Sequence, residues 1–310
     1  MADIPGHPPY PSGEQHSIGH GDQSAVVVEV GGGLREYRVD GFDVLDGFPA
    51  DGMIHAARGA LLLPWPNRLR DGRYRFDGED HQLALTEPAR GNAIHGLTRW
   101  ASWQPLKYAP DRVVMAHLLH PQPGYPYTLA LRAEYSLSSA GLSVAITGHN
   151  LGDRPAPFGA GQHPYLRVDE GLIDSARVRC PARLRFRADR RQIPAGEPEP
   201  VRGKYDLRRG SRLGRRRVDT AFTGLERDPD GLARFVMTGR RRQVEVWMDG
   251  GFEHLMVFTG DTLGLDERRR GLAVEPMTCA PNAFQNGIGL RVLHPGESFT
   301  ATWGITVEKT

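Results

Sequence analysis

Cysteine is almost missing from the sequence. Cys180 and Cys279 are the only two among 310 residues, too few for a disulfide framework in a chain of this length or for a thiolate metal site. This scarcity fits a reducing compartment, and we expect a cytoplasmic protein. Long apolar runs are also missing: the first 24 residues contain no signal-like apolar segment, and no stretch is long enough to span a bilayer. The sequence therefore predicts no membrane partner.

A net charge of either sign is missing as well. The chain has 39 Lys and Arg residues against 37 Asp and Glu residues, a formal charge of +2. Such a balance gives no general attraction to nucleic acid, so nucleic acid is not expected as a partner. Arginine is nevertheless clustered in three triplets, at 215–217, 240–242 and 268–270. We interpret them as solvated loops, with anion binding as the less favoured alternative.

No stretch shows the periodicity of a long amphipathic helix, a heptad or an internal repeat. Instead, 38 Gly and 24 Pro residues separate short alternating or β-branched segments, as is typical of strands joined by turns. We predict an all-β, antiparallel protein with few or no helices. A single domain over 25–310 would follow a flexible N-terminal arm over 1–24, or a tail laid over the body. The expected strands include residues 25–30, 34–39, 41–48, 59–64, 112–119, 127–137, 142–150, 233–238, 243–248, 255–259, 271–275, 290–293 and 298–307.

One acidic residue lies where an apolar segment meets a proline. Glu275 follows the apolar residues 272–274 and precedes Pro276, which has no N–H and is expected to end the strand. A carboxylate beside Pro276 and Met277 is partly desolvated, which raises its pKa and its basicity near neutral pH. For this stretch alone, an edge-strand glutamate that faces water is an equally good interpretation.

Two histidines lie at junctions flanked by glycine or proline. His95 precedes a glycine, and His163 lies in the glycine-rich segment 158–166, followed by Pro164 and Tyr165. Glycine permits close approach of a ligand to the backbone, and Tyr165 supplies an amphipathic face. Taken alone, His95 is more typical of a structural histidine than of a catalytic one. No His-x-x-x-His or other compact ligand spacing is present, so we do not expect a metal site.

Further polar candidates lie on rigid or turn-rich segments. The Pro-Trp-Pro segment 64–66 stiffens the approach to Asn67 and Arg68. The Arg68 guanidinium suits sugar hydroxyls or carboxylates, but a structural ion pair is about equally common. Asp219, three residues before Phe222, either caps a turn or accepts hydroxyls, and the cap is slightly favoured.

Taken in order, these motifs resemble those of the aldose 1-epimerase (galactose mutarotase) family over about residues 25–308. The matching pieces are Asn67-Arg68 with the segment 72–78, His95-Gly96, His163-Pro164-Tyr165, Asp219 with Phe222, and Glu275-Pro276 with the segment 281–284. Each piece is weak alone, and their combination in the right order is specific. The Pro-Trp-Pro-Asn-Arg form of residues 64–68 is most similar to bacterial subgroups. The fold that the resemblance implies is a large antiparallel β-supersandwich.

The resemblance implies an isomerase that interconverts the α and β anomers of a monosaccharide, with neither a cofactor nor a metal. It makes Glu275 the general base at the C1 hydroxyl and His163 the general acid at the ring oxygen, while His95 hydrogen-bonds the same region. It also implies hydroxyl contacts or stacking on the sugar for Arg68, Asp219, Asn67, Trp65, Tyr165 and Phe222. A monomer or a homodimer is expected.

Two alternatives stay open. The arginine triplets raise the alternative of an epimerase for a phosphorylated or sulfonated sugar, because such a substrate needs an anion clamp. A carbohydrate-binding or sensory protein that kept the sandwich and lost turnover is the other alternative. The presence of both Glu275 and His163 argues against that second one.

Overall fold

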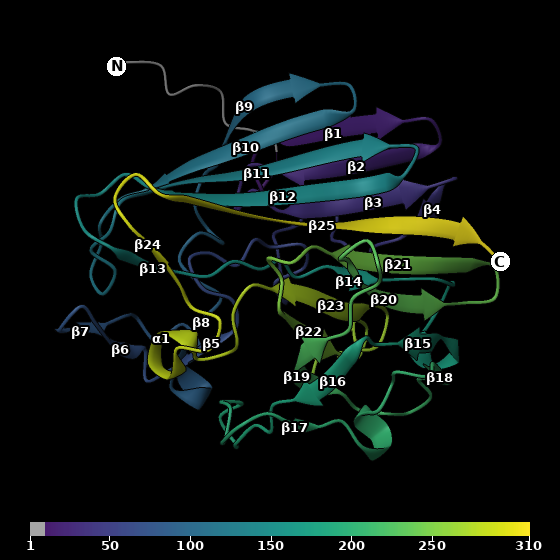
Figure 1. The fold of residues 1–310 in the computed structure, drawn as a ribbon. Coiled ribbons are helices and arrows are strands. Elements are labelled where there is room, and N and C mark those ends of the chain that lie inside the picture. Colours follow the sequence, from purple (N-terminus) through teal and green to yellow (C-terminus); the bar gives the residue numbers. More distant parts are fainter. Residues whose placement is uncertain (1–9) are drawn as a thin grey trace.

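The computed structural model describes residues 10–310, which form layered antiparallel sheets (Figure 1). The largest sheet has nine strands, in the order β18 (Ser211–Arg212), β15 (Arg177–Arg179), β20 (Ala233–Thr238), β21 (Arg242–Met248), β25 (Ser298–Lys309), β12 (Gly141–Asn150), β11 (Leu129–Ser138), β10 (Arg112–Leu119) and β9 (Gln104–Ala109). Its long strand β25 joins the meander β9 to β12 to the later strands. The prediction of an all-β, antiparallel supersandwich is confirmed.

A second sheet carries Glu275, Asp219, Tyr165 and Phe222, four of the nine candidate site residues. Its six strands run in the order β14 (Tyr165–Leu166), β23 (Leu272–Met277), β22 (His254–Phe258), β19 (Asp219–Leu225), β16 (Ala182–Arg185) and β17 (Glu199–Pro200). A third sheet consists of β1 (Gln15–His20), β2 (Gln23–Val28), β3 (Leu34–Val39) and β4 (Phe42–Asp43). Figure 1 shows the six-stranded sheet below the strands β9 to β12 of the nine-stranded one.

The smaller elements are short two-stranded pairs and helical turns. Three short pairs are β5 (Arg68–Arg70) with β8 (Asn92–Ile94), β6 (Arg73–Phe76) with β7 (Glu79–Gln82), and β13 (Ala156–Phe158) with β24 (Arg291–Leu293). Helical turns occur at α1 (Ala283–Asn286), Pro88–Arg90, Ile173–Ser175 and Gly203–Tyr205. Over residues 10–310, no helix has the length and apolar character needed to cross a membrane.

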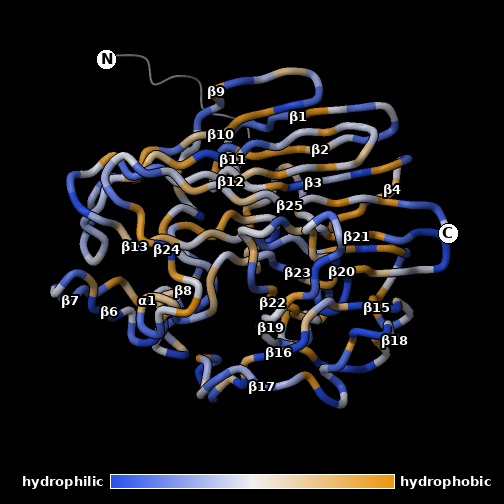
Figure 2. Tube along the Cα trace, in the orientation of Figure 1, coloured by the Kyte–Doolittle hydropathy of each residue, from blue (hydrophilic) through white to orange (hydrophobic). Residues whose placement is uncertain are grey.

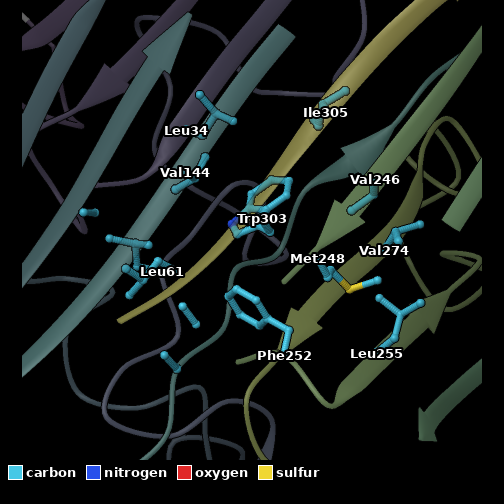
Figure 3. Close-up of a cluster of buried hydrophobic side chains, with 14 of the residues drawn as sticks. Leu34, Leu61, Val144, Val246, Met248, Phe252, Leu255, Val274, Trp303 and Ile305 are labelled. Atoms are coloured by element: carbon cyan, nitrogen blue, oxygen red, sulfur yellow. The ribbon is translucent and has the colours of Figure 1, made fainter. Parts of the chain in front are cut away.

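The core lies between the sheets because apolar residues alternate along the strands (Figure 2). On β12, Val144 and Ile146 are fully buried while their neighbours are partly exposed, which is the period of two that turns one strand face inward. Trp303 of β25 lies in the same cluster as Val144 (Figure 3). The cluster also includes Val274 of β23, so both large sheets share one core. Full burial of an aliphatic side chain of this kind stabilises the fold by about 1.5–3 kcal/mol.

Two predicted strands are wrong. Residues 59–64 form no strand, although Leu61 and Leu63 each make an isolated bridge, and the strand predicted over 41–48 shrinks to β4. A short buried apolar run satisfies the pattern of a strand whether or not its backbone is regular. In this case the run is buried as an irregular segment beside the site, with Leu61 bridged to Gln162.

The predicted flexible arm over 1–24 is wrong for its second half. β1 pairs with β2 along its whole length, and Ile18 is buried. The polar composition that suggested an arm reflects a strand with only one buried side chain. Residues 1–9 of the predicted arm lie outside the described residues.

Pro276 does not end its strand, contrary to the prediction. β23 continues to Met277, and Pro276 pairs with Leu255 of β22. The Pro276 carbonyl accepts the Gln162 N–H at 3.2 Å, so the backbone of Pro276 faces the irregular segment before β14. Its missing N–H therefore removes no bond to β22, and a proline is tolerated there.

Candidate active site

A pocket of about 420 Å³ lies over one face of the six-stranded sheet. Glu275 is paired in register with Met256, and Asp219 with Phe258. These four residues line the pocket, as expected for side chains two apart along β22 and opposite one another across antiparallel strands. The pocket wall is completed by the loops around His95 and His163, which the sequence separates widely. Its volume is within the range of small-molecule sites.

Glu275 and His163 form a buried pair on this wall. Glu275 Oε1 lies 3.2 Å from His163 Nε2, with side-chain exposures of 2% and 7%. Burial raises the pKa of Glu275 to about 8, with a smaller contribution from the nearby Asp219 charge. Burial also lowers the pKa of His163 to about 3. Both shifts favour neutral groups, so near pH 7 the pair holds one proton, shared as a carboxylic acid beside a neutral imidazole.

One acceptor of the pair is unused within the described chain. Glu275 Oε2 is buried and has no hydrogen-bond partner among residues 10–310. A buried polar atom without a partner costs about 1–3 kcal/mol, and such atoms are characteristic of sites that bind a ligand. The free oxygen therefore suits a hydroxyl donor in the pocket.

The backbone before His163 is fixed by a fully buried amide. Gln162 Nε2 donates to the Gly59 carbonyl and to Tyr135 Oη, while its Oε1 accepts from Trp303 Nε1. Gly161 has to be glycine, because a Cβ there would lie 2.9 Å from the Pro276 carbonyl oxygen. The His163 backbone is therefore held between both large sheets.

His95 is oriented by a reciprocal contact with Asn67. The His95 N–H donates to the Asn67 carbonyl at 2.8 Å, and the Asn67 N–H donates to His95 Nδ1 at 3.2 Å. Both residues adopt left-handed φ values, +61° and +57°, which are uncommon outside glycine and are concentrated at functional sites. Burial lowers the pKa of His95 well below its ordinary value. His95 is therefore neutral, and Nε2 carries its proton as a hydrogen-bond donor.

Arg68 and Asp219 also line the pocket, as the resemblance implies. Arg68 makes a two-pronged ion pair with Glu87, at 2.8 and 2.9 Å. The structural interpretation of Arg68 is therefore confirmed, and its contact with a sugar stays a prediction. Asp219 is half-buried, its pKa is raised by burial, and it makes no side-chain cap hydrogen bond among the described residues. The slightly favoured turn cap is therefore wrong, and Asp219 presents its carboxylate to the pocket.

Three aromatic residues predicted to stack on a sugar are not available for stacking. Trp65 packs against Phe284 in the core, and Phe222 is fully buried there; neither lines the pocket. Tyr165 does line it, but its ring stacks on His163 at 5.0 Å and lies under the Arg58 guanidinium at 4.8 Å. With its ring in contact with both His163 and Arg58, Tyr165 supports the position of His163 instead.

Other pocket residues were not predicted from the sequence. Trp100 is 58% exposed and lines the pocket, together with Arg99 and Arg90. Trp100 is a large exposed apolar residue, and it follows His95 by five positions. That adjacency to a candidate histidine is the signal by which it could have been found.

The arginine triplets do not reach the pocket. None of their nine members lines it, and six of the nine are exposed. Arg269 is buried, but its guanidinium is bound to Asp174 and Asp261. The triplets therefore give no support to an anionic sugar in this pocket.

Three residues of the site converge closely enough to suggest a metal centre. Potential ligand atoms of His95, His163 and Glu275 lie within 4.8 Å of one another, a cluster that sequence spacing could not reveal. His95 fits such a site poorly, because Nδ1 accepts the Asn67 N–H and Nε2 carries the proton. A metal bound to His95 would have to displace either the Asn67 N–H from Nδ1 or the proton from Nε2.

The fold and the pocket define a β-supersandwich protein with a buried carboxylate–imidazole pair. The sequence pattern of the family described as aldose 1-epimerase matches residues 14–306. The chain belongs to the aldose 1-epimerase family, whose members are isomerases that act on sugars.

Individual relatives and solved structures agree with this assignment. The uncharacterized protein YihR of Escherichia coli (strain K12) is 33% identical over 287 residues, covering 92% of this chain and 91% of that protein. Human galactose mutarotase is 26% identical over 54% of this chain and 50% of its own. The GalM/aldose epimerase homologue from C. elegans has the same fold, with a TM-score of 0.86, 16% identity, and coverage of 96% of this chain and 99% of that one.

Proposed function

We propose that this protein is a cofactor-independent mutarotase that interconverts the α and β anomers of an aldopyranose. The observation that carries the proposal is the Glu275–His163 pair, buried on the pocket wall at 3.2 Å. Mutarotation needs one group that takes the proton of the C1 hydroxyl and one that protonates the ring oxygen. The pair supplies both groups.

The proton count of the pair matches the reaction. In the ring-opening step, the shared proton moves from Glu275 to His163 Nε2 and then to the ring oxygen, while Glu275 accepts the C1 hydroxyl proton. The ring C–O bond breaks as the C1 carbonyl forms, and the pair again holds one proton. Rotation about C1–C2 and reversal of these transfers close the ring with either configuration, so no proton need be exchanged with solvent.

The surrounding polar groups suit the rest of the sugar. His95 Nε2–H would donate to an oxygen near C1, and Arg68 and Asp219 would bind hydroxyls. Asn67 acts through its contact with His95. Trp100 is the aromatic surface on which an apolar sugar face would pack.

The test is the rate of anomer interconversion in a panel of freshly dissolved aldoses, followed by polarimetry or exchange NMR. The wild-type protein should accelerate at least one aldose above the buffer rate. Glu275→Gln should lose about 10²–10⁴-fold, the usual contribution of a general acid or base. Absence of acceleration for every aldose, or full activity in Glu275→Gln, contradicts the proposal. Tight sugar binding without acceleration would favour the carbohydrate-binding alternative.

Three broader expectations accompany this function. We keep the assignment to a bacterial subgroup with the Pro-Trp-Pro-Asn-Arg form, supported by the 33% identity to an E. coli protein. Both cysteines are free and buried, which is compatible with the expected cytoplasmic location. A monomer or a homodimer remains the expected state.

A further inference from the structure

Arg99 is an arginine of the pocket wall with no ionic partner. Its guanidinium donates one hydrogen bond, from Nη2 to the Ile94 carbonyl at 3.5 Å, and its Cζ lies 5.7 Å from the Trp100 ring centroid. No carboxylate among residues 10–310 lies within ion-pair distance. Burial lowers the pKa of Arg99 below its ordinary value, with no carboxylate contribution that opposes the shift. An arginine still carries its charge under these conditions. Arg99 therefore presents an uncompensated cation to the pocket.

The other charges of the pocket do not neutralise it. Arg68 and Arg90 both form ion pairs with Glu87, so the Glu87 carboxylate does not compensate the charge of Arg99. Asp219 is the remaining ionised carboxylate on the wall, since Glu275 is protonated near pH 7. Three guanidiniums thus face two carboxylates, and the pocket has a net positive charge before substrate binds.

From this arrangement we infer that the preferred substrate is an anionic aldose, whose exocyclic carboxylate, sulfonate or phosphate binds Arg99. The inference rests on the mutarotase function proposed above and names its substrate class. Guanidinium donors bind such oxyanions in two-pronged geometry, and a partly desolvated site strengthens the attraction. The three anions share one chemistry at Arg99, and experiment can distinguish them.

The position of Arg99 couples the anion to the chemistry. Its charge is close enough to lower the pKa values of both His95 and His163. An anion bound at Arg99 offsets that charge and makes it easier for His163 to accept the shared proton. A neutral sugar leaves the Arg99 charge uncompensated, and that charge opposes protonation of His163. The anionic group should therefore raise kcat as well as lower KM.

The experiment compares kcat/KM for a neutral hexose with three analogues changed only at C6: the hexuronate, the 6-phosphate and the 6-deoxy-6-sulfonate. At least one anionic analogue should exceed the neutral hexose by tenfold or more in the wild-type protein. Arg99→Gln should reduce that ratio at least tenfold, while Arg99→Lys should retain part of it. The matched control is Arg268→Gln, because Arg268 is exposed and outside the pocket wall, and it should leave the ratio unchanged.

Each outcome has a distinct meaning. A neutral hexose that turns over as well as every anionic analogue overturns the anion inference and leaves the mutarotase function intact. An equal loss for neutral and anionic sugars in Arg99→Gln also overturns it, because the residue would then be structural. If no aldose is accelerated, the proposed function fails, and the substrate inference fails with it.

Discussion

Glu87 and Glu275 line the same pocket, yet their surroundings drive their ionisation in opposite directions. Burial acts to raise the pKa of both groups. At Glu87, hydrogen bonds from Arg68 and Asn92 outweigh burial and lower the pKa. At Glu275 the partner is a neutral imidazole, so burial prevails and the pKa rises to about 8. A carboxylate bound to arginine is a fixed anion, whereas one beside a histidine can transfer a proton.

The largest expected difference between the two carboxylates is in activity. Glu275→Gln should reduce kcat/KM by about 10²–10⁴-fold, because it removes a group that exchanges protons with substrate. Glu87→Gln should cost at most about tenfold, roughly 1.4 kcal/mol, because it only loosens Arg68. Side-by-side exchange NMR on the two variants checks this, with far-UV circular dichroism to verify folding. Equal losses would remove the distinction between the proton-transferring carboxylate and the structural one.

The next effect is on stability as a function of pH. Glu275 has a raised pKa in the folded state, so between about pH 4.5 and 8 the folded protein holds a proton that the unfolded chain has released. The unfolding free energy contributed by Glu275 therefore falls as pH rises through this window. Glu275→Gln lacks this loss, and its stability relative to wild type should rise by roughly 3 kcal/mol from pH 5 to pH 8.

Urea denaturation of the wild-type protein and Glu275→Gln at both pH values measures that change. His163 contributes an opposite slope between about pH 3 and 6.5, because its pKa is lowered by burial, but it is present in both proteins. A constant difference between the two proteins would show that folding does not raise the pKa of Glu275.

A smaller effect is expected in the pH–rate profile. The pair is active when it holds one proton, so wild-type kcat/KM should be level between about pH 5 and 7. Above about pH 8 the proton is lost, and the rate should fall tenfold per pH unit, about 1.4 kcal/mol each. Exchange NMR corrected for the buffer rate provides the measurement. A rate that keeps rising above pH 8 would mean that ionised Glu275 alone suffices.

The sequence predicted the elements that depend on local pattern. Residues 34–39, 112–119 and 233–238 are strands with the predicted bounds, because alternation and flanking turns define them. The family resemblance named Glu275, His163 and His95, and the structure brings these three together. Their roles in catalysis remain proposals.

Side-chain environments could not be predicted in the same way. Trp65 is buried and Trp100 is exposed, although both follow a rigid or turn-rich segment, because exposure depends on partners distant in sequence such as Phe284. The absence of a carboxylate near Arg99 is likewise a property of the folded chain. The sequence clusters pointed instead to Arg269, whose guanidinium is bound to Asp174, Asp261 and two backbone carbonyls.

The smallest expected effect concerns the stability that Glu87 provides. Its pKa is lowered in the folded state, so its contribution is present above the unfolded value of 4.5 and is lost as pH falls through the folded value. Glu87→Gln should cost about 1–2 kcal/mol of unfolding free energy at pH 7, because Arg68 loses a charged partner. The difference in unfolding free energy between Glu87→Gln and wild type should narrow below pH 4.5. This pH dependence is opposite to that of Glu275→Gln. Asp80→Asn, which breaks the exposed Arg75–Asp80 pair, is the matched control and should have no measurable effect. A Glu87→Gln protein as stable as wild type at pH 7 would show that the Arg68–Glu87 pair contributes nothing to the fold.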